Sequence, residues 1–280
     1  MPPLSTLPYK KAYRDQWQHT SEHLRAQGCY EWMAEQLDEL QPRKILDIGC
    51  GCGNGLLALI SRFEPQTLVS LDENVGCVDA TVKTLKEAGQ KPRYHKRLKY
   101  IQRAVDLYEV FCTDAPLELG SGISIVQADI GCEDHIVSDA LKRDAPFDAI
   151  TVWLIGTDRQ MLQTLGSKPG EYRRQIHERI LGLAINILRP GGWLQFVDRC
   201  AFPLTADQEQ LLVKNHEMLI NASHLKVLKH SIRSYEEAGD SGIPMSTLSG
   251  QVEHGTEMGL ISIIASSLAE TSETVSGCKS

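Results

Sequence analysis

One stretch of the chain decides the fold: Lys44-Ile45-Leu46-Asp47-Ile48-Gly49-Cys50-Gly51-Cys52-Gly53-Asn54-Gly55. It begins as a short apolar strand, enters a run with glycine at every second position, and leads into an apolar helical segment that ends at Phe63. Glycines between a strand and a helix allow a tight turn and let a ligand approach the main chain without a Cβ in the way. The stretch therefore predicts a ligand-binding turn at the edge of a sheet.

The spacing of these glycines excludes two common nucleotide sites. A dinucleotide fingerprint needs G-x-G-x-x-G, but the residue three after Gly51 is Asn54 and the residue three after Gly53 is Leu56. A phosphate-binding P-loop needs Gly-Lys followed by Ser or Thr, and this triplet occurs nowhere in the chain. What remains is an acidic residue, Asp47, two positions before a G-x-G-x-G turn.

Strand and helix patterns alternate along the rest of the chain, which is typical of a parallel sheet covered by helices. Apolar runs of strand length, several of them ending at an Asp, alternate with segments whose apolar residues recur at helical spacing. The strands are predicted over 44–48, 67–71, 123–127, 147–155 and 193–197, with weaker ones over 225–232 and 260–265. The helices are predicted over 20–40, 56–63, 171–188 and 205–220.

The glycine turn resembles the first motif of the class I S-adenosylmethionine-dependent methyltransferases, which Asp47, Gly49, Gly51 and Gly53 match position by position. In that family the turn packs against the methionine part of the cofactor, and the acidic residue sits beneath it. The resemblance implies a three-layer α/β fold, with a seven-stranded, mostly parallel sheet, one antiparallel strand and helices on both faces. It implies S-adenosylmethionine as cofactor, S-adenosylhomocysteine as product, and no metal.

Later positions extend the resemblance over residues 44–200 and, more weakly, to 266. Asp72 ends the second strand, where the family has a carboxylate that accepts hydrogen bonds from both ribose hydroxyls, a task that suits its two acceptor oxygens. Asp129 ends the third strand, where the family holds the adenine amino group, and Arg189-Pro190-Gly191-Gly192-Trp193 resembles a late motif. The residues implied to bind the cofactor are Asp47, Gly49, Cys50, Gly51, Gly53, Asp72, Glu73, Asp129, Ile130 and Trp153.

Two additions flank or interrupt the domain predicted over 44–266. Residues 1–43 form an N-terminal helical cap that could fold over the cofactor as a lid or merely pack as a surface helix, and residues 267–280 form a tail. Between 90 and 120 an apolar stripe at helical spacing predicts an inserted helix, with Lys96, Arg97 and Lys99 on its other face. That basic face is either solvated or contacts an acidic partner, and the apolar stripe could mediate a homodimer.

The acceptor site is predicted beyond the carboxyl ends of the strands, where ligands bind in open α/β sheets. Methyl transfer is an in-line displacement, so positioning supplies much of the catalysis and a base is needed only for a protonated nucleophile. Candidate catalytic residues are His19, Asp158 and Asp198; candidate substrate contacts are Tyr13, Trp17, Thr157 and Arg199. The fourth strand ends in Trp153-Leu154-Ile155-Gly156 and lacks the Asn/Asp-Pro-Pro-Tyr motif of many base-modifying methyltransferases.

Composition narrows the class of protein further. The net charge of -7 over 280 residues argues against a surface built for nucleic acid. No apolar run approaches the roughly 18 residues of a membrane span, and the eight cysteines form no CxxC pair, so we expect a reduced, cytoplasmic protein. The predicted function is methyl transfer to an O or N nucleophile of a small metabolite. The alternatives are an RNA or protein methyltransferase of the same fold, or a non-catalytic binding subunit.

Overall fold

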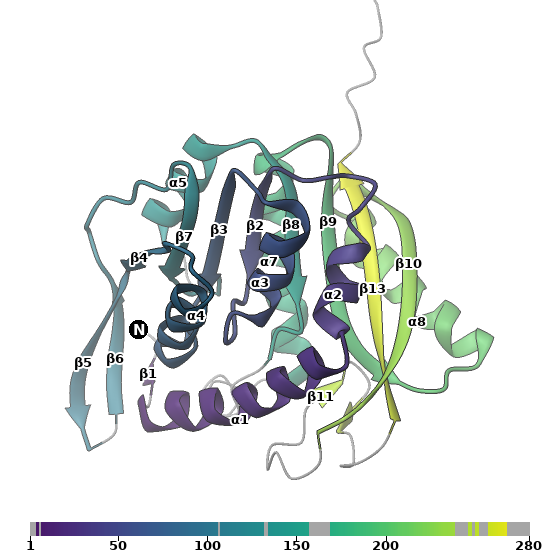
Figure 1. Cartoon of the computed structure of the whole chain (residues 1–280), viewed down its shortest axis with the longest axis horizontal. Coiled ribbons are helices and arrows are strands. Elements are labelled where there is room, and N and C mark those ends of the chain that lie inside the picture. The colour runs from purple at the N-terminus through teal and green to yellow at the C-terminus, as the bar shows by residue number, and fades with distance from the viewer. Residues whose placement is uncertain are drawn as a thin grey trace, which may run out of the picture.

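The computed structural model describes residues 4–5, 7–105, 107–131, 134–156, 169–238, 246–247, 250–251 and 257–267. Its centre is an eight-stranded sheet in the order β10-β13-β9-β8-β2-β3-β7-β4 (Figure 1). The strands are β2 (Lys44–Ile48), β3 (Thr67–Asp72), β4 (Arg93–Lys96), β7 (Gly122–Gln127), β8 (Phe147–Trp153), β9 (Leu188–Ala201), β10 (Leu225–Glu236) and β13 (Glu257–Ser267).

The strand directions confirm the predicted fold class. The pairs from β4 through β7, β3, β2 and β8 to β9 are all parallel, whereas β13 runs antiparallel to both β9 and β10. The sheet thus has one antiparallel strand between two that run with the rest. It has eight strands instead of the expected seven, because β4 adds to the edge of β7.

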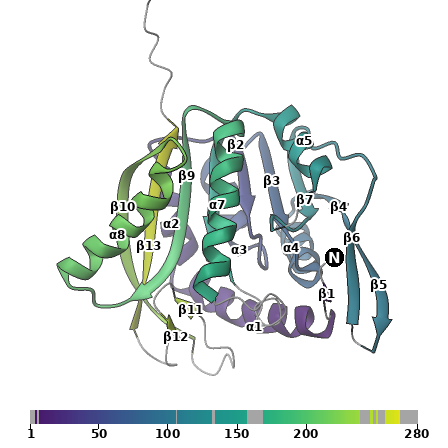
Figure 2. The same cartoon turned by 180° about the vertical axis from the view of Figure 1, so that it is seen from behind.

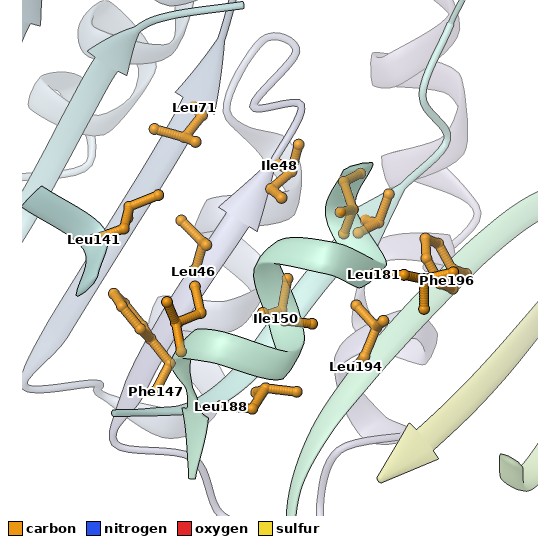
Figure 3. Packing of buried hydrophobic residues seen from close by; sticks show 14 of the residues in the cluster. Leu46, Ile48, Leu71, Leu141, Phe147, Ile150, Leu181, Leu188, Leu194 and Phe196 are labelled. Carbon is orange, nitrogen blue, oxygen red and sulfur yellow. The ribbon is translucent and has the colours of Figure 1, made fainter. Parts of the chain in front are cut away.

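Helices cover both faces of the sheet. The helices α2 (Cys29–Glu35), α3 (Asn54–Phe63) and α4 (Val75–Glu87) pack on one face, and α5 (His135–Asp144), α7 (Pro169–Ile187) and α8 (Ala206–Asn221) pack on the other (Figure 2). In Figure 3, Leu141 of α5 lies beside Leu46 of β2, and Leu181 of α7 lies beside Phe196 of β9. None of the helices in the described part of the chain is both long enough and apolar enough to cross a bilayer.

The N-terminal cap differs from the single predicted helix over 20–40. Helix α1 (Leu7–Ala26) begins earlier and ends before Gly28, whose φ of 69° breaks the helix and starts α2. Helix α1 runs along the edge where the parallel strands end (Figure 1). The predicted tail, from 268 onward, lies outside the described residues.

The prediction of an inserted helix between 90 and 120 was wrong. After β4, the strands β5 (Leu98–Ala104) and β6 (Leu107–Cys112) form a hairpin, to which β1 (Leu4–Ser5) adds at the edge of β6. The apolar residues of the stripe are Tyr, Leu, Ile and Val, several of which favour strands. Their spacing fits a helix, but pairing with other strands in the folded chain gives a strand instead. The homodimer expected through an inserted helix therefore loses the element that was to carry it.

The basic face of that segment is also not a solvated surface throughout. Arg97 is only 2% exposed, and its guanidinium donates to both carboxylate oxygens of Asp134 at 3.1 Å. It also donates to the carbonyl oxygens of Thr113 and Ala115. Arg97 therefore ties the hairpin to the start of α5, because Asp134 is also the N-cap of that helix.

Candidate cofactor and substrate site

A pocket lies at the carboxyl ends of β2, β3, β7 and β8, beneath α1. About 880 Å³ of space lies within it, part of which is open solvent. Most of the residues predicted to contact the cofactor, together with two of those predicted to contact substrate, form its wall. These are Gly49, Gly51, Asp72, Glu73, Asp129, Ile130 and Trp153, with Tyr13 and Trp17 from α1.

The glycine turn has a backbone that requires glycine. Gly49, Gly51 and Gly53 have φ angles of 96°, 52° and 89°, in the left-handed region that other residues rarely adopt. The N–H of Gly49 donates to the carbonyl of Leu71 at 2.8 Å, and the hydroxyl of Thr81 in α4 donates to the carbonyl of Gly51 at 2.9 Å. The turn is thereby fixed to β3 and to α4, and its main chain forms part of the pocket wall.

Two of the predicted cofactor residues serve the turn without lining the pocket. A Cβ at Gly53 would lie 3.2 Å from the Cα of Thr81, so this glycine allows α4 to pack closely. Cys50 is buried within the turn, and burial raises the pKa of its thiol well above the usual value. Both positions support the turn from behind.

Asp72 stands where β3 ends and faces the pocket. Its Oδ2 accepts the N–H of Gly51 at 3.1 Å, and its Oδ1 accepts the N–H of Asn74 at 2.8 Å. Burial raises the pKa of this carboxyl, and the two N–H donors oppose that shift. Each oxygen retains a second lone pair, so Asp72 can still accept hydrogen bonds from two neighbouring hydroxyls of a ligand.

Asp47 lies beneath the turn, as the resemblance implied, but it is not part of the pocket wall although it was predicted to bind the cofactor. It is 3% exposed, and the hydroxyls of Ser70 and Thr151 donate to its two oxygens at 2.7 and 2.9 Å. Burial raises its pKa to about 6 despite these two donors. The charge under the turn therefore changes near neutral pH.

Helix α1 is anchored across the top of the pocket. Lys10 forms an ion pair with Glu73, and the side-chain amide of Asn74 donates to the carbonyl of Lys10 at 3.1 Å. Farther along the helix, the indole of Trp17 lies against Gly51 and the hydroxyl of Tyr13 lies against Gly156, so closely that neither glycine has room for a Cβ. These contacts place both aromatic side chains in the pocket wall.

The substitution Gly51→Ala tests this close approach. The left-handed backbone at Gly51 costs a residue with a Cβ about 1–2 kcal/mol, and the added methyl group would displace the indole of Trp17. We expect a lower melting temperature and a change in tryptophan fluorescence that is absent in the Trp17→Phe background. An unchanged spectrum would show that Trp17 does not rest on the turn.

The structure places the predicted catalytic residues away from the pocket wall or does not describe them. His19 is exposed on α1, and Thr157 and Asp158 lie outside the described residues. Asp198 is 3% exposed and forms ion pairs with Arg173 at 3.4 Å and with His216 at 3.5 Å. Although burial alone would raise the pKa of Asp198, the hydrogen bond from His216 and the charge of Arg173 hold it well below its usual range. A carboxylate held in this way is a weak base.

Arg199, a predicted substrate contact, points to the opposite face of the sheet from Asp198. It is 4% exposed, its Nε donates to the hydroxyl of Tyr235 at 2.7 Å, and it forms an ion pair with Glu237 at 3.4 Å. Its guanidinium carbon lies 5.5 Å from the centre of the Trp17 ring. Trp17 therefore lies between Arg199 and the pocket.

Sequence reasoning missed several residues of the pocket wall, among them Asn74, Cys77 and Ile176. Asn74 had a usable signal, because an Asn after a strand and before a helix is a typical N-cap, and its side chain does accept the N–H of Gly76 at 2.9 Å. Cys77 and Ile176 had none. Each follows the helical spacing of its own helix, and only the packing brings both to one pocket.

The strand order and the turn together define the class of fold. Leaving out the added edge strand β4, the order β7-β3-β2-β8-β9-β13-β10 has the glycine turn after its third strand, β2, and its antiparallel strand second from the end. The chain has the fold of the class I S-adenosylmethionine-dependent methyltransferases.

No model of a known protein family and no curated protein matches the chain. Solved structures of similar shape include the N-methyltransferase NodS of Bradyrhizobium japonicum in complex with S-adenosylhomocysteine (14% identity, 83% of this chain and 85% of that one, TM-score 0.41). Others are precorrin 8W decarboxylase of Methanobacterium thermoautotrophicum (14%, 85% and 90%, 0.43) and a candidate RNA methyltransferase of Pyrococcus horikoshii (9%, 86% and 81%, 0.47). With TM-scores no higher than 0.47, these likenesses say nothing about what this chain does.

Proposed function

We propose that the chain transfers the methyl group of S-adenosylmethionine to an O or N nucleophile of a small metabolite. One observation carries the proposal: the glycine turn, Asp72 at the end of β3 and Asp129 after β7 all line a single pocket. In this assignment the turn receives the methionine part of the cofactor, Asp72 receives the ribose hydroxyls, and Asp129 receives the adenine amino group.

The chemistry of these residues fits such a cofactor. The turn presents main chain without Cβ atoms, and Asp72 keeps one free lone pair on each oxygen for a hydroxyl. When bound, the cofactor supplies an activated methyl group on a sulfonium. The chain binds and orients the reactants and, through Tyr13 and Trp17 of α1, excludes water from the pocket.

Three features support a small acceptor over RNA. Tyr13 and Trp17 of α1 form part of the pocket wall, which leaves less room for a polymer than for a small molecule. The basic segment that motivated the RNA alternative is partly used inside the fold, since Arg97 pairs with Asp134 and Arg93 donates to the carbonyls of Leu119 and Ser121. The acidic net charge of -7 points the same way.

Binding and transfer can be tested separately. Calorimetry with S-adenosylmethionine and S-adenosylhomocysteine should show saturable binding of both by the purified chain, and absence of binding would overturn the proposal. Transfer is then followed with the cofactor labelled in its methyl group, against separate small-molecule, RNA and protein fractions. Label in the RNA or protein fraction would assign the acceptor to that class, and binding without any transfer would indicate a non-catalytic subunit.

The pKa of Asp47 predicts how cofactor affinity depends on pH. Because the pKa of Asp47 is raised to about 6, the protonated form contributes stability to the fold that is complete below about pH 3.8 and is lost as the pH rises through about 6. The ionised form, present above about 6, favours the cationic groups of the cofactor. We therefore expect S-adenosylmethionine affinity to fall several-fold on acidification through about pH 6. The same acidification should raise the contribution of Asp47 to the melting temperature.

Asp47→Asn is the matched control for this prediction, because the amide keeps the size of the side chain and removes its charge. The variant should bind the cofactor near neutral pH about as weakly as the wild type does in acid, with a flatter pH profile. An identical profile for both chains would assign the titration to another group, such as Asp72, whose pKa burial also raises.

A further inference from the structure

An ion pair beneath α1 has two buried polar atoms without partners. Nη2 of Arg199 and Oε1 of Glu237 make no hydrogen bond among the residues the structure describes, although the two side chains are only 4% exposed each. Two other atoms of the pair have partners: Tyr235 accepts from Nε of Arg199 and donates to Oε2 of Glu237, each at 2.7 Å. A buried charged group with an unmet hydrogen bond is costly and calls for a ligand or a water.

The two unpaired atoms differ in kind, and this difference selects a ligand. Nη2 of Arg199 is a cationic donor that suits a carboxylate, whereas Oε1 of Glu237 is an anionic acceptor that suits an ammonium. Because the arginine and the glutamate already neutralise each other, an anion alone would leave a net buried charge, which is unfavourable. A group with both charges meets both atoms and keeps the site neutral.

The pair is also within reach of the pocket. Arg199 lies on β9 two residues beyond Val197, which pairs with Trp153 of the pocket wall, and Glu237 directly follows β10. One side chain, Trp17, lines the pocket on one side and covers the guanidinium of Arg199 on the other, at 5.5 Å. A rotation of Trp17 would open the pair to a ligand already in the pocket.

We propose that Arg199 and Glu237 bind the zwitterionic amino-acid group of a ligand in this pocket, with Trp17 as the movable side chain between the ion pair and the pocket. That group occurs at the methionine end of the cofactor and in amino-acid acceptors. The inference rests on the proposed function for the identity of the cofactor. The evidence for the ion pair itself is its burial and its hydrogen bonds, which do not depend on that function.

The first arm of the test asks whether the pair takes the cofactor. Calorimetry on the full chain compares S-adenosylhomocysteine with 5′-methylthioadenosine, which has the same nucleoside and thioether but no amino-acid end. The wild type is expected to prefer S-adenosylhomocysteine at least tenfold. The double variant Arg199→Met, Glu237→Gln, which stays neutral, should lose this preference while binding methylthioadenosine as before. The matched control is Arg103→Met, whose arginine is exposed and pairs with Glu109 on the hairpin.

The second arm asks whether the pair takes an acceptor. Each proteinogenic L-amino acid is titrated at millimolar concentration into chain saturated with S-adenosylhomocysteine. An amino-acid acceptor is supported if the wild type and the control bind an amino acid and the double variant does not. In that case the double variant should keep its preference for S-adenosylhomocysteine over methylthioadenosine. If the double variant does not fold, Glu237→Gln replaces it, with the same losses expected.

The proposal is overturned if the variant keeps both the nucleoside preference and any amino-acid binding of the wild type, or if the wild type shows neither. A wild type that binds neither nucleoside overturns the proposed function alone, because the amino-acid titrations without nucleoside still test the pair.

Discussion

Asp72→Ala is expected to weaken binding of S-adenosylmethionine at least a hundredfold. In the proposed complex this carboxylate accepts two hydroxyl hydrogen bonds, and bonds to a charged acceptor contribute about 1.5–3 kcal/mol each. The substitution also removes the acceptor of the Gly51 and Asn74 N–H groups, so both the ligand contacts and the shape of the turn are affected. Calorimetry measures the loss, and circular dichroism shows whether the sheet remains folded.

Two further variants separate these contributions. Asp72→Asn keeps one carbonyl acceptor and should retain more affinity than Asp72→Ala, whereas Asp79→Ala, on the exposed face of α4, should bind as the wild type does. Wild-type affinity in a folded Asp72→Ala chain would remove the ribose assignment and, with it, the main support for the proposed cofactor.

Arg97→Met is expected to lower the free energy of unfolding by about 3–5 kcal/mol, the usual cost of removing one partner from a buried ion pair. The substitution leaves Asp134 buried without its cation, together with the carbonyl groups of Thr113 and Ala115. Urea denaturation measures the effect. For comparison, Arg103→Met breaks an exposed pair with Glu109 and should cost less than about 1 kcal/mol.

The double variant Arg97→Met, Asp134→Asn tests the reason for that loss. Neutralising Asp134 removes the unpaired charge, and the amide can still accept the N–H groups of Ile136 and Val137 at the start of α5. We expect it to recover part of the stability lost in Arg97→Met. A double variant as unstable as the single one would show that packing, and not the stranded charge, sets the cost.

The glycine turn was predictable because its requirements are local. A backbone with three left-handed residues needs glycine at those positions, and Asp47 and Asp72 end or follow short apolar runs that can be read without knowing the fold. The inserted hairpin was not predictable in the same way. Tyr94, Leu98 and Ile101 fit a helical period, yet Tyr94 pairs with Ile125 of β7, while Leu98 and Ile101 pair with Cys112 and Glu109 of β6. The spacing within the segment does not reveal these partners.

On the acceptor side of the site, too, the strand that carries the residues could be predicted from the local sequence, whereas their partners could not. Asp198 and Arg199 were both placed at the end of a strand predicted over 193–197, whereas β9 continues to Ala201 and includes both residues. Neighbouring residues on a strand point to opposite faces, so one meets His216 of α8 and the other meets Tyr235 of β10. Those partners come from segments whose positions only the folded chain defines.

The loop after β3 contributes both to the cofactor site and to the anchoring of α1, so the two are thermodynamically coupled. Asp72 faces the cofactor site, while the next two residues, Glu73 and Asn74, hold Lys10 of α1. In the position held by Glu73 and Asn74, α1 contributes to the pocket wall. If this position tightens cofactor binding by some factor, then bound cofactor stabilises this position of α1 by the same factor. Amide hydrogens of α1 should therefore exchange more slowly in the presence of S-adenosylhomocysteine, and that slowing should vanish when Lys10 is replaced.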